Sequence, residues 1–354
     1  MKPGLEGVIA AETVLSLADP ATGTQWVRGH TIPTLVADFG YEGTVALLWD
    51  GFAGPRQSRE AVQEKLGAAR HAAFDALEGW LPLAASRPLD EALRIALAVL
   101  PDASTPEQIV GTLAVAVPVL LRTADGKPLM APDPALSTPA DLLRMLHGVA
   151  PDAGAVRALD TYITAMADSG LNSSTFAGRT IASTRASLAA AVLGAWCAFT
   201  GPLHGAAPGP TLDLLDAVAA ADDMDAWIEA RLRAGERLMG FGHRVYSGND
   251  PRAQAMRAAL QRMGTSASRL EFAARVEERV AAVVERVKPG RKLPANVEIM
   301  AALLLDAVGI PRQAFTAVFA VSRCPGWIAH ALEQQQTGRM IRPTSQYVGP
   351  PVAA

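Results

Sequence analysis

The sequence predicts an all-α protein with many helices and one large domain. Apolar residues recur three and four positions apart along most of the chain, as on one face of a helix, whereas the alternating pattern of strands is scarce. The chain has 354 residues, half of them apolar, which is enough for one large hydrophobic core and a smaller lobe. No internal repeat is present, so a repeat architecture is not expected.

Five segments carry the helical spacing most clearly. These predicted helices cover residues 89–97, 182–198, 276–287, 297–308 and 312–321. The first follows Pro88, which suits a helix start, and the third ends at residues 288–290 (KPG), where proline and glycine break a helix. The second is rich in alanine with few charges, so it is predicted to be buried on all sides. Residues 309–311 (GIP) separate the last two.

Other parts of the chain predict strands, turns and loops. Residues 8–15 and 25–30 are predicted to pair as two short strands, with the turn at residues 19–23 (DPATG). Stretches near 123–139 and 201–210 contain Pro and Gly, so they are predicted to be loops rather than long linkers.

Charge and targeting signals exclude several classes of protein. The 32 basic and 35 acidic residues leave a net charge of −3, without the broad basic field of nucleic-acid-binding proteins. No run of about 18 apolar residues predicts a membrane span, and the opening residues do not resemble a signal peptide. Cys197 and Cys324 lie in apolar surroundings without a C-x-x-C spacing. Buried thiols of a cytoplasmic protein are therefore expected rather than a disulfide.

Two histidine motifs in the second half of the chain are the clearest signs of chemistry. Residues 201–207 (GPLHGAA) and 240–246 (GFGHRVY) place His204 and His243 beside glycines, where the backbone can turn tightly and a ligand can come close. Histidine can donate or accept a proton near neutral pH. With Arg252 following the second motif, the pattern predicts a pocket for an anionic substrate whose carbonyl group is polarised.

Other chemistries find less support in the sequence. Four histidines are expected at the surface or hydrogen-bonded in the core: His30, His71, His147 and His330. The pair of His330 and Glu333 lacks the further ligands of a metal site, so no metal is expected. Ser174 and Ser322 have no recognisable catalytic triad, and neither a dinucleotide-binding fingerprint nor a P-loop lysine is present.

The carboxyl-terminal third adds a series of motifs in a fixed order. They are residues 294–298 (PANVE), 319–323 (FAVSR), 326–330 (GWIAH), 339–343 (RMIRP) and 347–350 (YVGP). Together with the two histidine motifs, residues 4–13 (GLEGVIAAET) and residues 171–176 (LNSSTF), they closely resemble the citrate synthase family. The resemblance is to its compact bacterial form, which includes 2-methylcitrate synthases. It covers nearly the whole chain, most specifically residues 165–350.

This resemblance implies a two-lobed helical fold. Residues 206–310 would form a small mobile domain, and residues 1–205 and 311–354 the large domain, with ligands in the cleft between them. Closure of the cleft would exclude water and strengthen the charge interactions inside. The resemblance also implies a homodimer with shared active sites. Its substrates would be small molecules, among them a coenzyme A (CoA) thioester, with no permanently bound cofactor.

The implied reaction joins acetyl-CoA, or another short acyl-CoA, to oxaloacetate and hydrolyses the thioester to give citrate and CoA. Removing a proton from the thioester methyl group needs a carboxylate base and a hydrogen-bond donor at the thioester oxygen. The family's base matches Glu298, and its enol-stabilising histidine matches His204. The histidine that polarises the ketone of oxaloacetate matches His243.

The substrate-binding residues of the family also have matches. Carboxylates call for forked guanidinium donors, and the family's arginines match Arg252, Arg323 and Arg342. In the family the neighbouring subunit supplies the last of these. Ser169 occupies the position of a histidine that helps to hold the 2-oxo acid. The backbone expected to approach CoA is that of Gly240, Phe241 and Gly242.

Four positions depart from the usual family pattern. Glu298 stands where aspartate is usual, and the added methylene moves the carboxylate; a misplacement of about 1 Å can cost about 10²-fold in rate. Ser169 and Gly170 replace a histidine and an acidic residue, and Ser247 stands where many relatives carry a basic residue near the CoA phosphates. These changes leave open a related enzyme with another 2-oxo acid or acyl-CoA, and a weakly active or inactive regulatory homologue.

Several of these residues also have a purely structural interpretation. Arg252 fits a solvated first helical turn, Arg342 a surface loop, and Glu298 a helix start, where a negative charge is favourable. An unpaired Arg323 within an apolar helix would be costly, so a partner or an anionic ligand is expected there.

Overall fold

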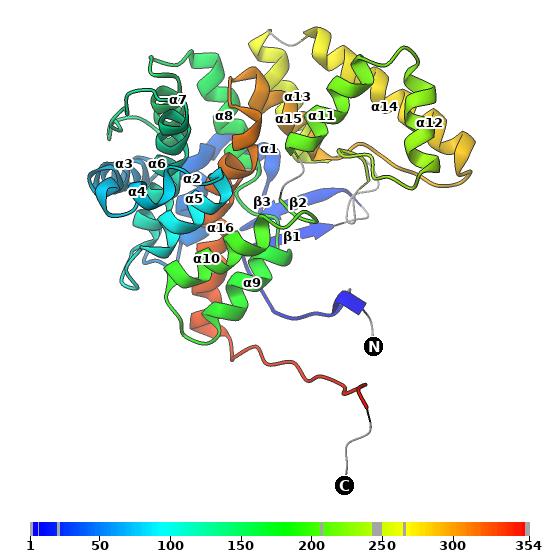
Figure 1. Cartoon of the computed structure of the whole chain (residues 1–354). Helices are drawn as coiled ribbons and strands as arrows, with labels where there is room; N and C mark the ends of the chain where they lie inside the picture. The colour runs from blue at the N-terminus through cyan, green and yellow to red at the C-terminus, as the bar shows by residue number, and fades with distance from the viewer. Residues whose placement is uncertain are drawn as a thin grey trace.

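The computed structural model describes residues 3–5, 7–19, 22–205, 208–242, 250–264 and 267–350. Most of them are helical, so the all-α prediction is confirmed (Figure 1). The first half contains η1 (Pro3–Leu5), β1 (Ser16–Asp19), β2 (Thr24–Val27), β3 (His30–Thr31), α1 (Ile32–Thr34), η2 (Leu35–Phe39), α2 (Gly40–Trp49), α3 (Arg59–Asp75), η3 (Leu77–Gly79), α4 (Leu81–Ala84), α5 (Leu89–Ala98), α6 (Pro106–Ala124), α7 (Thr138–His147) and α8 (Ala153–Ala165). The second half contains α9 (Ser173–Ala182), α10 (Leu188–Phe199), α11 (Pro208–Ala219), α12 (Met224–Arg233), α13 (Pro251–Met263), α14 (Ala267–Val287), α15 (Val297–Ala307), η4 (Arg312–Ala314) and α16 (Phe315–Thr337).

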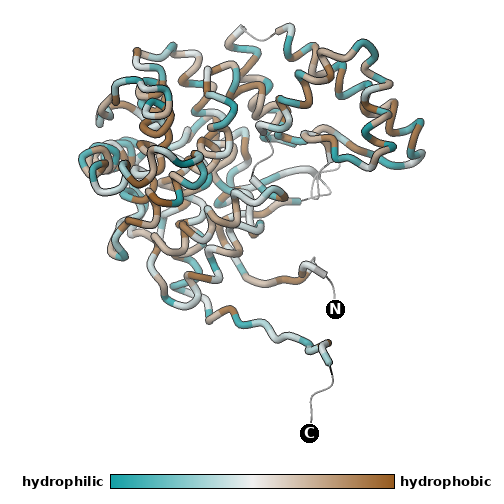
Figure 2. Tube along the Cα trace, in the orientation of Figure 1, coloured by the Kyte–Doolittle hydropathy of each residue, from teal (hydrophilic) through white to brown (hydrophobic). Residues whose placement is uncertain are grey.

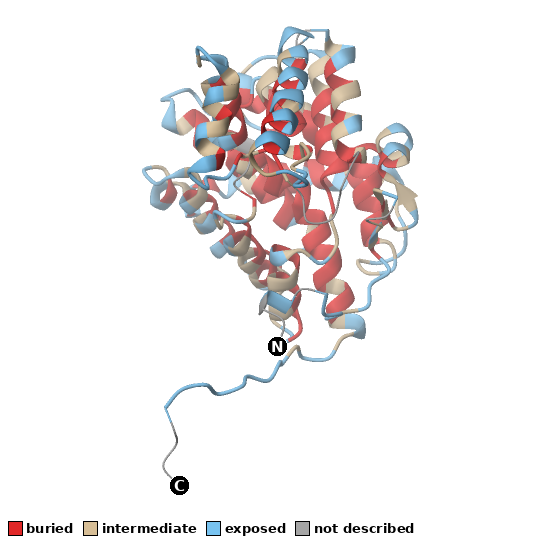
Figure 3. Cartoon of the chain, turned by 90° about the vertical axis from the view of Figure 1, so that its right-hand side faces the viewer, coloured by how far each residue is buried: buried red, intermediate tan, exposed pale blue. Residues whose placement is uncertain are grey.

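Helix α16 forms the buried centre of the fold. It packs against α2, α6, α8, α9 and α10, and every residue from 317 to 331 is buried (Figure 3). The sequence predicted a helix only over residues 312–321, which was too short because Pro325 does not end it. Proline has no N–H, so the Val321 carbonyl, four residues before Pro325, lacks its usual helical donor. The Tyr41 hydroxyl donates to this carbonyl instead, at 2.8 Å.

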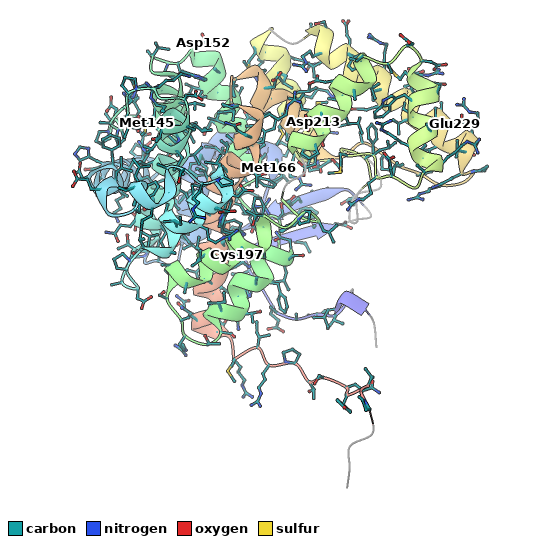
Figure 4. The ribbon with its side chains drawn as sticks, in the orientation of Figure 1. Met145, Asp152, Met166, Cys197, Asp213 and Glu229 are labelled. Atoms are coloured by element: carbon teal, nitrogen blue, oxygen red, sulfur yellow. The ribbon has the colours of Figure 1, made fainter. Side chains whose placement is uncertain are left out.

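The predicted helix over residues 182–198 was wrong at its start. Helix α9 ends at Ala182 and α10 begins at Leu188, with Arg185 at a positive φ of 69° between them. The Ser187 side chain caps α10, a start signal that the alanine-rich pattern obscured. Helix α10 is also not buried on all sides, because Cys197 is exposed (labelled in Figure 4), contrary to the expected buried thiol.

The second cysteine agrees with the sequence interpretation. Cys324 is buried in α16, and neither cysteine forms a disulfide. Burial raises the pKa of the Cys324 thiol, which keeps it protonated and inert.

A small antiparallel sheet lies beside the helices in the order β1-β2-β3. The first strand was predicted too early: residues 8–13 contain no strand, and pairing runs from Ser16 to Asp19. Leu15 is fully buried, but Val8 and Ile9 are exposed, so no core surface holds the earlier segment as a strand. The turn falls within residues 19–23 as predicted, although positions 20 and 21 lie outside the described residues.

One described helix, α6, is long and apolar enough to cross a membrane by length and composition alone. Within the fold, 78% of its most apolar window is buried. It packs against α3, α5, α7 and α16. These contacts are those of a core helix, which passes the same test of length and hydropathy.

Helices α11 to α15 gather on one side of the molecule, at the upper right of Figure 1. Helix α14 carries one apolar face, as predicted, and its brown and teal stretches alternate in Figure 2. Arg269 of this helix pairs with Asp216 of α11 and Asp306 of α15, which ties the group together at its surface. Helices α13 and α15 also pack against α8, so their first turns lie next to the central helices.

Arg70 and Asp141 form a buried ion pair between α3 and α7. The Nε–Oδ2 distance is 2.9 Å, and the two side chains are 1% and 0% exposed. The backbone N–H of Asp133 also donates to this carboxylate at 3.0 Å. Removing the negative charge would leave the Arg70 guanidinium uncompensated in the core, which is costly.

We therefore expect Asp141→Asn to lower the free energy of unfolding by about 3–5 kcal/mol, measured by urea denaturation. The matched control is Arg87→Ala, which breaks an exposed pair with Glu91 and should cost no more than about 1 kcal/mol. An equal loss in the two variants would contradict the role given to the buried pair.

Candidate active site

Most of the predicted site residues that the structure describes line one cavity of about 170 Å³. It lies where the end of α8 and the first turns of α13 and α15 meet α16 and the turn after α10. Its polar lining includes Ser169, Asn172, His204, Arg252, Glu298 and Arg323. Met166, labelled in Figure 4, and Phe319 supply apolar surface. The sequence therefore predicted the main chemical groups of this cavity.

Arg252 is held in the first turn of α13 and is only 5% exposed, so it is not a solvated helix residue. The Asp250 carboxylate caps the helix by accepting from the Arg252 backbone N–H at 2.9 Å. The same carboxylate accepts from Arg252 Nε at 3.0 Å and from Nη2 at 2.6 Å. This forked pair fixes the plane of the guanidinium and leaves Nη1 directed at Ser169, 3.1 Å from its Oγ.

Arg323 brings a second buried guanidinium to the same point from α16. It is 2% exposed, its Nε donates to the Met166 carbonyl at 2.7 Å, and its Nη2 donates to Ser169 Oγ at 3.1 Å. Burial lowers the pKa of Arg323 to about 10, so the group stays charged near neutral pH. Of the partner or anionic ligand expected there, the described residues supply these two hydrogen-bond partners and the nearby charges of Asp168 and Glu298, without an ion pair.

Ser169 thus accepts a hydrogen bond from both guanidinium groups. We call this arrangement of Ser169, Arg252 and Arg323 the arginine cradle. Two buried positive charges facing one hydroxyl oxygen form a site that a carboxylate would satisfy better than a neutral group.

Glu298 provides the carboxylate of the cavity. It lies in the first turn of α15, where Asn296 Oδ1 accepts from the Glu298 backbone N–H at 2.9 Å. Its Oε2 is buried and has no hydrogen-bond partner among the described residues. Burial raises the pKa of Glu298 to about 7, although the charges of Arg252 and Arg323 lower it. The carboxylate can therefore take up and release a proton near neutral pH, as a general base requires.

His204 lies in the turn after α10 and is half-buried. The Ser174 backbone N–H donates to its Nε2 at 3.3 Å, so this nitrogen is an acceptor and the neutral ring carries its proton on Nδ1. Burial, together with the charge of Arg323, lowers the pKa of His204 to about 4. The imidazole is therefore neutral near pH 7, and its Nδ1–H can stabilise a negative charge that develops nearby.

Ser174 orients this histidine and was not assigned a role from the sequence. Its Oγ has one hydrogen to donate, either to His204 Nε2 at 2.9 Å or to Asn172 Oδ1 at 2.8 Å, and it accepts from Trp327 Nε1 at 3.1 Å. Ser174 is 0% exposed, so its hydroxyl positions the ring and is not available as a nucleophile. The only sequence signal for it was its place in the 171–176 motif.

A chain of buried polar residues ends at Asp168, the residue before Ser169 of the arginine cradle. Arg179 Nη1 donates to His330 Nδ1 at 3.0 Å, so His330 Nε2 carries a proton and donates to Asp168 Oδ1 at 3.2 Å. Burial raises the pKa of Asp168, but the interactions with His330 outweigh it and hold that pKa at about 2. His330 is therefore a hydrogen-bonded core residue, as expected, and Glu333 forms an ion pair with Arg179. No cluster suited to a metal ion occurs in the described part of the chain.

The loop of Gly240 and Gly242 is joined to the start of α15. The Gly242 N–H donates to the Pro294 carbonyl at 2.7 Å, and the Asn296 N–H donates to the Gly240 carbonyl at 2.9 Å. Both glycines have φ near +83°, and a Cβ on Gly240 would lie 2.7 Å from Thr211 Cγ2. Only glycine fits this conformation so closely against its neighbours, and the loop is thereby fixed next to Glu298.

A second cavity, of about 340 Å³, opens beside this loop. Phe241 and Gly242 line it together with the basic residues Arg237, Lys288 and Arg291. None of these three cations forms an ion pair with another described residue. The acid Glu236 also lines the cavity and pairs with Arg231, so the wall keeps an excess of positive charge, which suits a phosphate-bearing group.

Other predicted positions lie apart from the cavity. His243 and Ser247 are outside the described residues. Arg342 is exposed in the tail that leaves the body after α16 (Figure 1), and it is not among the residues that line the cavity of its own chain. Gly170 has φ +64° and its N–H donates to Asp168 Oδ2 at 3.2 Å, which gives it a structural role in the turn after α8.

Comparison with known proteins gives a consistent result along the chain. The family profile described as "Citrate synthase, C-terminal domain" matches residues 4–344. A putative citrate synthase 2 of Mycobacterium tuberculosis is 36% identical, over 98% of this chain and 93% of that protein. The citrate synthase of Haloferax volcanii is 33% identical, over 99% and 96% of the two chains. A 2-methylcitrate synthase of Mycobacterium tuberculosis is 30% identical, over 99% and 91%.

Solved structures agree in fold. The citrate synthase of Thermotoga maritima superimposes with a TM-score of 0.88 at 29% identity, over 100% of this chain and 97% of that one. The citrate synthase of Thermoplasma acidophilum, solved with carboxymethyl coenzyme A and oxaloacetate, gives a TM-score of 0.84 at 22% identity, over 99% and 97% of the two chains.

Proposed function

Because the chain belongs to the citrate synthase family, we propose that it condenses acetyl-CoA with oxaloacetate and hydrolyses the thioester to release citrate and CoA. A condensing activity of the acyltransferase type, with a CoA thioester as substrate, is common to the family. The choice of acyl group and 2-oxo acid is our proposal. The supporting observation is a single cavity that combines an unpaired carboxylate, a neutral histidine donor and two buried guanidinium groups.

The first step is removal of a proton from the thioester methyl group. Glu298 takes this proton, and its raised pKa makes it a stronger base than an ordinary carboxylate. The electrons move towards the thioester oxygen, where the Nδ1–H of His204 donates a hydrogen bond. Because the imidazole is already neutral, it stabilises the enolate without first losing a proton.

The second step joins this carbon to the ketone carbon of oxaloacetate. The C=O electron pair moves to the ketone oxygen, which takes up a proton, and we assign polarisation of that oxygen to His243. The arginine cradle binds carboxylate oxygen in place of its bonds to Ser169. Water then attacks the thioester carbon, the C–S bond breaks, and CoA leaves as the thiol.

These contacts favour an active enzyme over a purely regulatory homologue. A buried carboxylate oxygen such as Glu298 Oε2, with no hydrogen-bond partner in the described part of the chain, is costly to maintain, and such a group is typical of functional sites. Ser169 is shorter than the histidine usual in the family, but it is built into the arginine cradle. The cradle is thereby retained for a substrate carboxylate.

The acyl group is tested by comparing kcat/KM for acetyl-CoA and propionyl-CoA, with oxaloacetate as partner and the product identified by mass spectrometry. The two thioesters differ by one methylene, worth about 1–3 kcal/mol in an apolar pocket. The proposal expects acetyl-CoA to be preferred about 10-fold or more. A preference for propionyl-CoA would instead identify a 2-methylcitrate synthase.

We assign the nucleotide part of CoA to the 340 Å³ cavity beside Phe241. Replacing Lys288 and Arg291 together by alanine should raise the KM for acetyl-CoA about tenfold, because two cations near the phosphates are lost. Initial rates should leave kcat and the KM for oxaloacetate nearly unchanged. A fall in kcat with an unchanged KM for acetyl-CoA would contradict this assignment.

We further propose a homodimer in which Arg342 enters the active site of the neighbouring subunit. The tail that carries it exposes Met340, Tyr347 and Val348, at 57%, 66% and 86%, which is costly in water and suits a partner surface. We also propose that residues 206–310 form a small mobile domain and that residues 1–205 and 311–354 form the large domain. We propose a cytoplasmic location as well.

Complementation tests the shared site. His204→Ala and Arg342→Ala should each be nearly inactive alone, whereas mixed dimers contain one site with both native residues. Co-refolded or co-expressed mixtures should therefore regain activity that neither parent has. Sedimentation confirms that dimers form, and mixed dimers without recovered activity would exclude a shared site.

A further inference from the structure

The C-terminal tail that follows α16 is held to the body by two hydrogen bonds near its start (Figure 1). Gln334 Nε2 donates to the Arg339 carbonyl at 3.0 Å, and the Ile341 N–H donates to Ser183 Oγ at 3.0 Å. The side chains of Gln334 and Ser183 belong to buried residues, whereas Arg339 and Arg342 are exposed. The two bonds therefore fix the backbone directly before Arg342.

Gln334 also belongs to the chain of buried polar residues that reaches the arginine cradle. Its Oε1 accepts from Arg179 Nε at 3.0 Å, and Arg179 is joined through His330 to Asp168 by the bonds described above. All four residues are at most 4% exposed. Asp168 precedes Ser169, whose hydroxyl accepts from both guanidinium groups of the cradle. One series of hydrogen bonds therefore links the start of the tail to the groups that bind carboxylate.

The backbone at Gly338 passes close enough to Gln334 to leave no room for a side chain. A Cβ on Gly338 would lie 1.9 Å from Gln334 Nε2, so any larger residue there would push the amide out of its position. The members of the chain are shielded from water, and breaking one bond would leave a buried polar group unsatisfied, which is costly. The tail and the cradle are therefore held in one frame.

We propose that Gln334, held by Arg179, is a positioning residue that places the tail, and with it Arg342, for binding a dicarboxylate in the active site of the partner subunit. This inference rests on the proposed function and on the proposed homodimer. An arginine on an exposed tail loses much conformational freedom when it binds a ligand. Fixing the backbone directly before Arg342 lowers that entropy cost, so the arginine contributes more to the affinity.

The test is calorimetric titration of oxaloacetate into the full-length protein, which needs no catalysis. In the wild-type background, Arg342→Ala should weaken binding about tenfold, because a charged hydrogen-bond donor is lost. In a Gln334→Leu background, where the tail is no longer held at Arg339, the same change should cost less than about twofold. The matched control is Gln335→Leu, which breaks a bond to the Ala186 carbonyl and not to the tail. In that background the cost should again be about tenfold.

A merely structural role would lower the affinity of Gln334→Leu but leave the cost of Arg342→Ala unchanged. An equal cost in all three backgrounds would therefore overturn the proposal. Gly338→Ala is a second background, which displaces the Gln334 amide without removing it and should act like Gln334→Leu, with each fold checked by thermal unfolding. Wild-type protein that binds no oxaloacetate would contradict the proposed function together with this inference, whereas normal wild-type binding with equal costs would overturn this inference alone.

Mixed dimers show which subunit the positioning serves. A Gln334→Leu subunit keeps its own His204 and, in a mixed dimer with His204→Ala, receives a native tail from its partner. This pair should therefore recover the wild-type KM for oxaloacetate, as the pair of Arg342→Ala with His204→Ala should. If the Arg342→Ala pair recovers it and the Gln334→Leu pair does not, the defect lies within the subunit that carries Gln334→Leu, and positioning of the tail is excluded.

Discussion

Replacing Glu298 by glutamine is expected to lower kcat for condensation about 10³-fold while leaving both KM values within a few-fold. The amide has nearly the same shape as the carboxylate but cannot accept the methyl proton. Because Glu298 Oε2 has no partner among the described residues, the substitution breaks no hydrogen bond between that atom and a described residue. The variant should therefore fold normally, and the loss would report on chemistry rather than on structure.

The pH dependence of kcat/KM provides a second signature of the same base. Burial raises the pKa of Glu298 to about 7, and only the deprotonated form can take a proton. Activity should therefore fall about tenfold per pH unit below 7 and level off above it. His204 does not contribute to this limb, because its lowered pKa of about 4 keeps it neutral throughout.

Two matched variants separate the base from other acids. Glu298→Asp keeps a carboxylate at a displaced position and should lose less than the glutamine variant, at about 10²-fold or below. Glu277 of α14 is another acid whose pKa is raised by burial, but it pairs with Arg257 outside the cavity. Glu277→Gln should keep full activity, and a Glu298→Gln enzyme with normal kcat would exclude Glu298 as the base.

The second large effect is expected at His204. His204→Ala should lower kcat about 10²–10³-fold, the usual cost of losing one donor to a developing oxyanion. The KM for oxaloacetate should change little, because the arginine cradle is intact. His71→Ala removes an exposed histidine beside Asp75 and is the matched control, with activity expected to be unchanged.

Ser174→Ala tests how the His204 ring is oriented. The backbone N–H of Ser174 still holds Nε2 as an acceptor, so the ring should keep its tautomer but lose a neighbour that fixes its position. We expect a smaller loss in kcat, about tenfold, than for His204→Ala. A loss as large as that of His204→Ala would mean that the serine takes part in the chemistry directly.

Local signals in the sequence predicted the helices that begin and end at clear breakers. The start of α5 and the ends of α14 and α15 follow proline and glycine signals that act within a few residues, whereas α14 begins at Ala267, well before the predicted segment 276–287. Helix α16 was predicted too short because its course through Pro325 depends on Tyr41, which lies far away in the sequence and bonds the released carbonyl. Propensity alone cannot reveal such a tertiary contact.

In the site, too, local motifs were predicted from the sequence, whereas features that depend on tertiary contacts were not. The motifs around His204, Arg252, Glu298 and Arg323 predicted groups that meet in one cavity. The residues that orient them, such as Ser174, were not assigned from the sequence, because serine near a helix start is common and its partner lies 30 positions away. Tautomer and pKa also depend on burial and on neighbours from other helices, so only the folded chain could reveal them.

The most direct test of the central account is release of free CoA from acetyl-CoA by the purified wild-type protein, with and without oxaloacetate. The account predicts release that requires oxaloacetate, yields citrate in equal amount, and is lost in Glu298→Gln. CoA release that does not depend on oxaloacetate, or no release at all from acetyl-CoA, would contradict the assignment of this cavity to citrate synthesis.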